Sequence, residues 1–349
     1  MNYEEALKLI EPPDKQAMQQ CAMRWDSIAK PLHSLGKLES GVIQLAGIAG
    51  TSQFRLDKKA LVIMCADNGV VAEGVTQSTS EVTAIVSENF QDMNSCACIM
   101  AEQIGAKVFP VDIGICIDTK LPANKKVAYG TKNMAQEPAM TRAEAILAIE
   151  VGINTVLELK EEGYDIIATG EMGIGNTTTS SAIAAVLLDL PIEKVTGKGA
   201  GLSNAGLKRK IEVIKHSIEI NHPDKDDPID VLSKLGGFDI AGIVGLFLGG
   251  AAAKLPVVID GFISSVAALI ALQIEPKVIN YILPSHQSKE NAGKLLLDAL
   301  GLEPYLTCDM CLGEGTGAIA LFPLLDMGLA VYHQMSTFEQ VDIEAYQPL

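Results

Sequence analysis

The chain has 349 residues and a formal net charge of −16 at pH 7, so long-range repulsion argues against a surface that binds nucleic acid or an anionic membrane. Its length permits one large domain, or a large and a small domain. Hydrophobic residues make up 48% of the chain but aromatic residues only 5%, and there are 31 glycines. This mixture is typical of parallel strands packed under helices, and it predicts an α/β protein.

The N-terminal segment MNYEEALKLIEPPDK carries acidic residues and two prolines where a signal peptide needs a basic start and an apolar core. We therefore expect a cytoplasmic protein. The longest apolar segment, residues 240–253, is interrupted by glycines. It is shorter than the roughly 20 helical residues that cross a bilayer, so we predict a buried helix.

The seven cysteines are odd in number and lie in apolar segments. This distribution favours reduced, buried thiols over a disulfide framework. Cys308 and Cys311 form a CxxC pair without a second pair or a nearby histidine. We expect neither a metal ion nor a cofactor.

Residues 1–50 have helical spacing, with Trp25, Ile28 and Leu32 as candidates for the core. The last part of the chain, from about residue 307, contains a glycine-rich turn and a predicted helix over residues 318–331. We predict that residues 1–50 and 307–349 form a small helical domain. The remaining residues, 51–306, would form a large α/β domain.

Five segments after residue 50 share one pattern, in which a short apolar run is followed by an acidic or hydroxyl residue and then by glycine or a turn. They are residues 60–70, 107–115, 164–176, 256–262 and 278–288. Helical patterns separate them, and a repeated strand–turn–helix order predicts a Rossmann-like parallel sheet flanked by helices. Ligands of such sheets bind beyond the carboxyl ends of the strands. The polar residues expected there, and hence in one shared pocket, are Asp67, Asp112, Glu171, Asp260 and Ser285.

Helix start signals support this order of elements. Thr141 and Glu144 have the spacing of a capping box before residues 145–159, and Ser203 precedes the apolar pattern of residues 207–220. The polar segment over residues 221–230 is predicted to be a loop that caps the next helix.

The stretch TGEMGIGNTTTSSAI, residues 169–183, joins a predicted strand to a predicted helix. Glycines at 170, 173 and 175 let main-chain N–H groups approach an anion, and the threonines at 177–179 add hydroxyl donors at a helix N-terminus. A tight turn without a ligand is the alternative. The stretch lacks the Lys-Ser/Thr of a Walker loop and departs from the dinucleotide pattern GxGxxG. Glu171 at an anion-binding turn therefore needs an explanation.

Three other segments carry candidate site residues. Residues 196–210 place Lys198 and Lys210 around a helix start, although a solvated basic helix face is the alternative. Glu314 lies between two glycines, where a helix cap is the alternative to a ligand contact. Asp260 lies in a segment similar to a phosphoribosyl pyrophosphate loop but is its only acid, so a ribosyl phosphate ligand would lack a pyrophosphate leaving group. His286 is the one histidine whose setting, LPSHQS, suggests a role.

Eight motifs occur in order between about residues 30 and 325. They are KPLHSLGKLE (30–39), ADNGVVAEGVTQ (66–77), TGEMGIGNTTTSSAI (169–183), TGKGAGL (196–202), GGFDIAGIVG (236–245), VVIDGFISSVAAL (257–269), PSHQSKE (284–290) and LGEGTGA (312–318). Together they resemble the signatures of the nicotinate-nucleotide:dimethylbenzimidazole phosphoribosyltransferase (CobT-type) family. Each motif alone is weak, whereas eight in order are specific.

The resemblance implies a reaction in which a base attacks C1′ of nicotinate mononucleotide, nicotinate leaves and an α-ribotide forms. It also implies a homodimer, with a small domain built from both chain ends. Glu314 would be the general base, and Glu171 would line the same cavity. The residues expected at the ribose and phosphate are Gly173, Gly175, Asn176, Thr177, Lys210, Asp260 and Ser288. Those expected at the base are Gln77, Ile85 and Leu312.

The chain departs from the family pattern in places. His33 replaces the first glycine of KPxGSLG, Asn68 replaces the histidine of ADHG, and Ile85 falls where a glutamine near the base is expected. The acceptor could therefore be dimethylbenzimidazole, another benzimidazole, adenine or a phenol. Alternatives are a phenol-activating subunit of a heterodimer with a paralogue, a non-catalytic partner subunit and a nucleotide-binding dehydrogenase.

Overall fold

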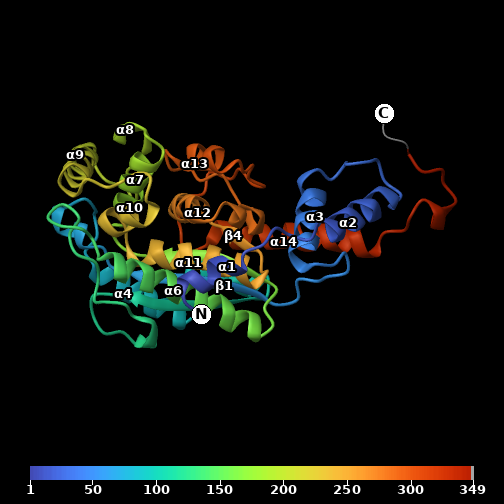
Figure 1. Ribbon diagram of the computed structural model, residues 1–349, viewed down its shortest axis with the longest axis horizontal. Helices are drawn as coiled ribbons and strands as arrows, with labels where there is room; N and C mark the ends of the chain where they lie inside the picture. Colours follow the sequence, from blue (N-terminus) through green and yellow to red (C-terminus); the bar gives the residue numbers. More distant parts are fainter. Residues whose placement is uncertain (347–349) are drawn as a thin grey trace.

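The computed structural model describes residues 1–346. Within them a five-stranded sheet has the order β2-β1-β3-β4-β5, and every neighbouring pair is parallel. The strands are β1 (Lys59–Ala66), β2 (Ala106–Gly114), β3 (Ile166–Met172), β4 (Val257–Ile259) and β5 (Ile282–Pro284). Helices flank the sheet (Figure 1), so the predicted α/β class with a parallel sheet is confirmed.

Side chains alternate between the two faces of β1 and pack into two separate cores. Val62 and Met64 belong to one core, which they share with α6 (Arg142–Glu161), α11 (Phe238–Ala253) and α12 (Phe262–Ile274). Leu61 and Ile63 belong to the other, which they share with α3 (Lys37–Ala49), α5 (Cys96–Gln103) and α14 (Thr316–Gln334). With both faces covered, the middle of β1 is apolar on both sides.

The helix predicted over residues 240–253 is α11, and its side chains are buried from Phe238 to Ala251. α11 approaches α6 closely because glycines face each other: a Cβ on Gly152 would touch the carbonyl of Gly242 and lie 2.8 Å from Cα of Gly245. Only a hydrogen atom fits between the two backbones at this crossing.

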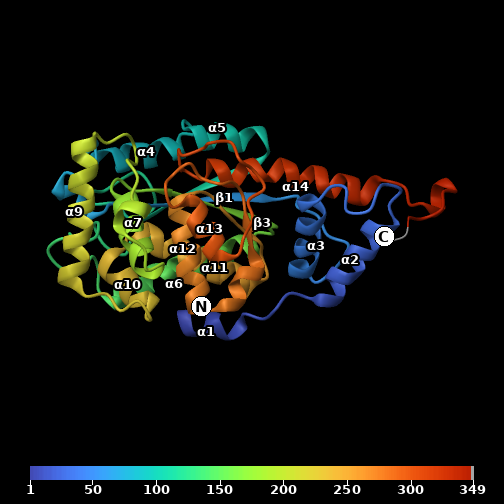
Figure 2. The ribbon, with the colours of Figure 1, turned by 90° about the horizontal axis from the view of Figure 1, so that it is seen from above.

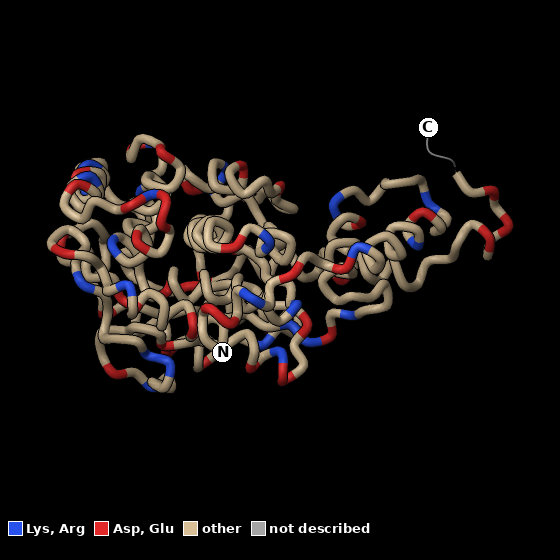
Figure 3. The backbone as a smooth tube through the Cα atoms, viewed as in Figure 1, with Lys and Arg blue, Asp and Glu red and all other residues tan. Residues whose placement is uncertain are grey.

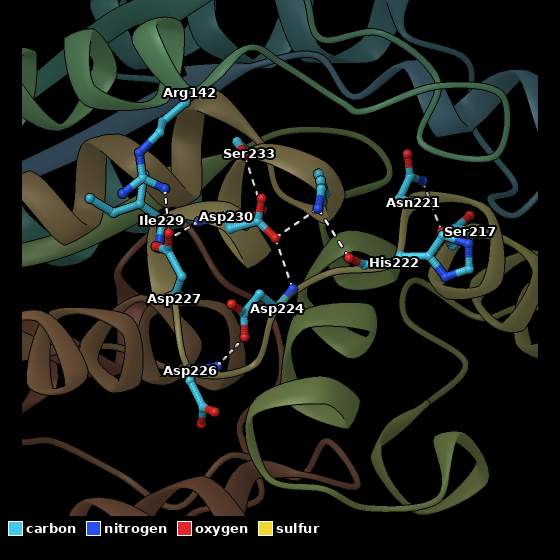
Figure 4. Close-up of polar contacts among 11 residues, drawn as sticks. Arg142, Ser217, Asn221, His222, Asp224, Asp226, Asp227, Ile229, Asp230 and Ser233 are labelled. Atoms are coloured by element: carbon cyan, nitrogen blue, oxygen red, sulfur yellow. Dashed lines mark hydrogen bonds and ion pairs between the residues drawn. The ribbon is translucent and has the colours of Figure 1, made fainter.

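The predicted helix starts are confirmed. Thr141 and Glu144 form the capping box of α6, and Ser203 caps α9 (Asn204–Asn221). Asp227 caps α10 (Pro228–Leu235) by accepting the N–H groups of Ile229 and Asp230, and Arg142 pairs with Asp227 at 2.7 Å (Figure 4). The loop is shorter than predicted, because residue 221 ends α9 and residue 228 begins α10, and residues 222–227 fix α10 against α6.

The fifth predicted strand is shorter than the sequence pattern indicates. Residues Pro276–Tyr281 form the 3₁₀ helix η3, and only Ile282–Pro284 pair with β4. Pro276 explains the difference, because proline at the start of a helical turn has the required φ and lacks the N–H that a strand would use.

α2 (Lys15–Ser27) and α3 lie beside the sheet and pack with the far part of α14 (Figures 1 and 2). Trp25 contacts Tyr332 of α14 with ring centroids 5.3 Å apart. Trp25 and Ile28 are buried as predicted, whereas Leu32 is only partly buried. α1 (Tyr3–Leu9) packs instead on α11 and α6. The division of the chain into two domains stays a prediction.

By length and composition alone, α14 could cross a membrane. However, 56% of its 18-residue apolar stretch is buried inside the protein. It contacts α3, α5 and β3, so it is a core helix here. Acidic and basic residues are spread over the whole backbone (Figure 3). The remaining helices are η1 (Gly69–Glu73), α4 (Glu81–Gln91), η2 (Ala123–Lys125), α7 (Asn176–Leu187), α8 (Ile192–Val195), α13 (Gly293–Leu300) and η4 (Glu339–Val341).

We predict that Gly152→Ala lowers the free energy of unfolding by about 2 kcal/mol or more, because the new methyl group forces α6 away from α11. Gly328→Ala is the matched control: its Cβ would lie 3.4 Å from Val42, an ordinary contact, within α14. That variant should gain up to about 1 kcal/mol from helix propensity. Chemical denaturation measures both, and equal stabilities would refute the close-packing explanation.

Candidate functional site

The polar residues at the carboxyl ends of the five strands have different roles. Asp112 pairs with Lys126 at 3.2 Å and accepts the N–H of Ile115 at 2.9 Å. Asp67 accepts the N–H of Cys116 at 2.9 Å. Both carboxylates therefore fix nearby loops. Ser285 does not line the cavity either, and its hydroxyl donates to the Asp260 carbonyl at 3.1 Å. The prediction that all five strand-end residues share one pocket is therefore wrong for these three, because local partners hold them away from the cavity.

A cavity lies beyond the ends of β3, β4 and β5. The residues of interest in its lining are Glu171, Asp260, His286, Ser288, Glu290 and Leu312. Because three of them are acids, we call it the acidic cavity. It brings together the ends of three strands and the turn before α14.

A second cavity adjoins the first, since Thr177 lines both. The residues of interest in its lining are Gln77, Gly173, Gly175, Thr177, Lys198 and Lys210. We call it the lysine cavity. Negative and positive side chains thus occupy neighbouring compartments on either side of Thr177.

The glycine-rich turn after β3 forms part of the lysine cavity. Gly175 has φ +95°, and a Cβ there would lie 2.9 Å from Val71. It precedes α7, whose N-terminus favours an anion. Thr177 accepts a hydrogen bond from Lys210 at 2.8 Å. Burial lowers the pKa of Lys210 to about 8, so a phosphate there would restore its full charge.

Of the three threonines predicted as donors, only Thr177 lines the cavities. Thr178 and Thr179 are buried in α7, and the hydroxyl of Thr179 donates to the carbonyl of Asn176 at 3.0 Å. The sequence pattern could not separate these threonines, because the helical turn decides which one faces the ligand.

Glu171 is 8% exposed at the end of β3. The side-chain amide of Asn176 donates to the Glu171 carboxylate and, at 3.0 Å, to Oδ2 of Asp239. Burial, and then the charge of Asp239, raise the pKa of Glu171 to about 8. Burial likewise raises the pKa of Asp239 to about 6. The amide predicted to contact the nucleotide is therefore engaged by two carboxyl groups.

Asp239 was missed by the sequence analysis, which used GGFDIAGIVG only as a motif. The signal was present, because Asp239 is the one charged residue in the apolar sequence that becomes α11. A charge in a fully buried helix needs a partner or a function.

Asp260 caps α14. Its Oδ1 accepts the N–H groups of Gly317 at 2.7 Å and Ala318 at 3.1 Å, and Oδ2 accepts that of Gly315 at 3.2 Å. A Cβ on Gly317 would overlap the His286 ring, so this glycine admits the histidine. The predicted contact of Asp260 with a ribosyl phosphate stays a prediction, but the structure gives its carboxylate a capping role.

His286 is buried beside Asp260, with Nδ1 3.1 Å from the hydroxyl of Ser285. Burial lowers the pKa of His286, and the Asp260 carboxylate opposes this shift. Ser288 lines the acidic cavity, and its hydroxyl accepts the N–H of Glu290 at 3.3 Å. The segment PSHQSKE thus contributes three residues to the acidic cavity.

Glu314 has φ +60° between Gly313 at +94° and Gly315 at +88°. A Cβ on Gly313 would touch the Glu171 carboxylate, and one on Gly170 would lie 2.7 Å from the Glu314 carbonyl. The Glu314 side chain turns toward α5, where Oε2 accepts the N–H of Ala97 at 3.2 Å. Its backbone is therefore beside Glu171, while its carboxylate is held at a helix N-terminus. The expected cavity shared by both glutamate side chains is not found, because Glu171 lines the acidic cavity and Glu314 does not.

The three residues predicted for the base pocket lie in different places. Leu312 lines the acidic cavity and is 57% exposed, Gln77 lines the lysine cavity and donates to the carbonyl of Gly201, and Ile85 is 59% exposed on α4. The structure does not gather them into one pocket, and their role at a base stays a prediction.

Three cysteines are exposed, namely Cys96, Cys308 and Cys311, so the expectation of buried thiols is wrong for them. The turn that carries Cys308 and Cys311 lies at the surface, although its sequence is apolar. Cys311 also lines the acidic cavity. Over residues 1–346, no group of three or more His, Cys, Asp and Glu side chains is arranged to hold a metal ion.

A family model described as "Phosphoribosyltransferase" matches residues 10–343. The two adjoining cavities lie at the carboxyl ends of parallel strands, where ligands of such sheets bind.

Two curated relatives are named nicotinate-nucleotide–dimethylbenzimidazole phosphoribosyltransferase. The protein from Acetivibrio thermocellus is 50% identical over 99% of both chains, and that from Ruminiclostridium cellulolyticum is 49% identical over the full length of both. The crystal structure of CobT from Thermus thermophilus has a TM-score of 0.89 and 36% identity, covering 95% of this chain and 100% of that one. The chain belongs to the nicotinate-nucleotide–dimethylbenzimidazole phosphoribosyltransferase family.

We predict that Asp260→Ala lowers the free energy of unfolding by about 2–4 kcal/mol, because three buried N–H groups lose their acceptor. Asp298→Ala is the control, since Asp298 makes only an exposed pair with Lys294. Its effect should stay below about 0.5 kcal/mol. Urea denaturation compares the two, and similar small losses would exclude the capping role.

Proposed function

We propose that the protein transfers the phosphoribosyl group of nicotinate mononucleotide to 5,6-dimethylbenzimidazole or a related base. The products are nicotinate and an α-ribotide such as α-ribazole 5′-phosphate, used to assemble the nucleotide loop of cobamides. The observation that carries the proposal is the adjoining acidic and lysine cavities at the strand ends of a chain in this family.

The lysine cavity suits the phosphate. Lys198 and Lys210 supply positive charge, and the turn at Gly173 and Gly175 lets main-chain amides approach at the N-terminus of α7. The ribose would then extend past Thr177 into the acidic cavity. Glu171 and the phosphate occupy separate compartments, which explains why a carboxylate stands beside an anion-binding turn.

The acidic cavity suits the reacting carbon. Loss of nicotinate builds positive charge on the ribose, as glycoside cleavage does, and an ionised Glu171 near C1′ would stabilise that charge. The ring nitrogen of the bound nicotinate is already positive and departs neutral. No general acid is therefore required at the leaving group.

Glu314 is the proposed general base that takes the N–H proton of the attacking azole. Its backbone adjoins Gly313, which touches Glu171, and its carboxylate is held by the Ala97 N–H. An acceptor between Leu312 and the N-terminus of α5 would reach both Glu314 and the open side of the acidic cavity. The acceptor site is thus proposed on the α5 side.

Homodimer formation and a cytoplasmic location are parts of the same proposal. The apolar side chains of Ile85 and Leu312 are 59% and 57% exposed, which favours their burial by a second chain or by the acceptor base.

Incubation of the purified protein with nicotinate mononucleotide and a panel of dimethylbenzimidazole, adenine and phenol tests the function. Nicotinate release with a given base identifies that base as an acceptor. If no base leads to nicotinate release while no paralogue is present, the partner-subunit alternative is favoured.

Glu314→Gln should reduce turnover by roughly 100-fold or more while nucleotide binding persists, because glutamine still accepts the Ala97 N–H but takes no proton. Steady-state kinetics and a binding titration measure the two effects. Glu303→Gln, at an exposed residue paired with Lys37, is the control and should leave turnover unchanged. Near-normal turnover in the Glu314 variant would remove this residue from the base role.

Gly175→Val should weaken nucleotide binding by roughly 10-fold or more, because a β-branched residue strains a backbone with φ +95° and meets Val71. Gly50→Val is the matched control, with φ +69° at the end of α3 and open space around its Cβ. It should lose stability and keep its affinity. Unchanged affinity in the Gly175 variant would place the phosphate elsewhere.

A further inference from the structure

Glu171 and Asp239 are two buried carboxyl groups joined through one amide. The side-chain nitrogen of Asn176 donates to both, so each relies on the same donor. Glu171 lies at the end of β3 and lines the acidic cavity, whereas Asp239 is fully buried in the first turn of α11. Two negative charges this close, in a site of low polarity, repel each other strongly.

Hydrogen-bond accounting points to a proton in this cluster. Oδ1 of Asp239 and Oδ1 of Asn68 are buried and make no hydrogen bond of ordinary geometry within residues 1–346, although the N–H groups of Ile240 and of Asp239 itself lower the pKa of the Asp239 carboxyl group. A Cβ on Gly237 would touch both oxygens, so they face the same small volume. A proton on the Asp239 carboxyl group would relieve the repulsion between these two acceptors.

The groups around Glu171 are mostly acidic. Asp239 on α11 and Asp260 after β4 both raise its pKa, while the Asn176 amide on α7 and the main chain of Glu314 lower it. The further titratable or charged groups around the pair are Cys65 on β1, Asp67 beyond β1, and His286 and Glu290 beyond β5. The lysines nearest to it line the adjoining cavity.

We propose that Glu171 and Asp239 hold one proton between them in the empty enzyme, and that a nucleotide with a positively charged ring nitrogen releases this proton when it binds. The inference rests on the proposed function, since nicotinate mononucleotide carries a quaternary ring nitrogen next to C1′ and its ring carboxylate farther away. The proton leaves the pair for solvent, no covalent bond to carbon changes, and the ionised Glu171 pairs with the ring nitrogen.

The sign of the effect follows from the direction of the pKa shift. A carboxyl group whose pKa is raised to about 8 holds its proton below that pH and loses it above. A cation nearby favours the ionised form, so its arrival lowers the pKa and expels the proton. The release is therefore largest near pH 7 and fades above pH 8.

This exchange fits the order of events in the reaction. A neutral Glu171 offers less repulsion to the phosphate as the nucleotide enters past Thr177. The ionised Glu171 is then formed where positive charge will develop on the ribose. Asp239 acts as a positioning residue, because it sets the charge of Glu171 through Asn176 and does not line the cavity.

The test is isothermal titration calorimetry of the unmodified protein at pH 7 in three buffers of different ionisation enthalpy. Nicotinate mononucleotide is compared with ribose 5-phosphate, which has the same phosphate and no ring, so proton exchange at the phosphate and Lys210 cancels in the comparison. We expect the nucleotide to release about one proton more than the sugar phosphate. Equal proton counts would overturn the proposal.

Two variants locate the proton. In Glu171→Gln the difference between the two ligands should vanish, and its persistence would also overturn the proposal. In Asp239→Asn the loss of a negative charge lowers the pKa of Glu171, so the release should fall at pH 8 and persist at pH 6.5. If the number of protons released by Asp239→Asn matches that of the unmodified protein at every pH, Asp239 is not part of the pair. Thermal unfolding checks that both variants fold, and the ligand comparison itself needs neither.

Nicotinate release in the presence of an acceptor base distinguishes this proposal from the proposed function. If the enzyme turns over but both ligands release the same number of protons, the proposed function holds and the proton proposal is wrong. If nicotinate mononucleotide neither binds nor turns over, both fail.

Discussion

The contact between the glycine-rich turn before α14 and the ends of β3 and β4 determines the geometry of the site. Gly313 and Gly315 bring the turn against Glu171 and the carbonyl of Thr169, and Asp260 holds the first N–H groups of α14. Side chains on those glycines would separate the turn from the sheet. Both proposed catalytic acids depend on this one contact, because it sets the backbone of Glu314 beside Glu171.

The second constraint is electrostatic. A chain with a net charge of −16 must bind a nucleotide that itself carries negative charge. The structure separates the charges into two cavities. Lysines and a helix N-terminus lie on one side of Thr177, and carboxyl groups lie on the other. Long-range repulsion is screened at physiological salt, and short-range donors then decide the binding.

The sequence predicted the framework well. The parallel sheet, the capping box of α6 and the buried α11 follow from local patterns, since apolar spacing and cap residues act over one or two turns. Of the site, the sequence located Glu171, Thr177 and Lys210 correctly at cavities. The flanking glycines made Glu314 a candidate site residue, and the family resemblance assigned it the role of general base.

What the sequence could not predict depends on contacts between distant segments. Asp260 and Glu171 occupy equivalent positions after a strand, yet only the docking of α14 makes Asp260 a cap. Asp239 lies in the sequence of an apolar helix, and only the hydrogen bonds of Asn176 to both carboxyl groups show that it is joined to Glu171. The exposure of Cys308 and Cys311 likewise depends on the position of their turn at the protein surface, which the local sequence does not determine.

α14 begins at the glycine-rich turn that carries Glu314 and ends among α2 and α3, with Tyr332 against Trp25 (Figure 2). A helix of 19 residues is about 28 Å long, and Pro323 removes one of its internal hydrogen bonds. A single helix therefore connects the turn beside Glu171 with helices from the other end of the chain, and Pro323 is where that connection bends most readily.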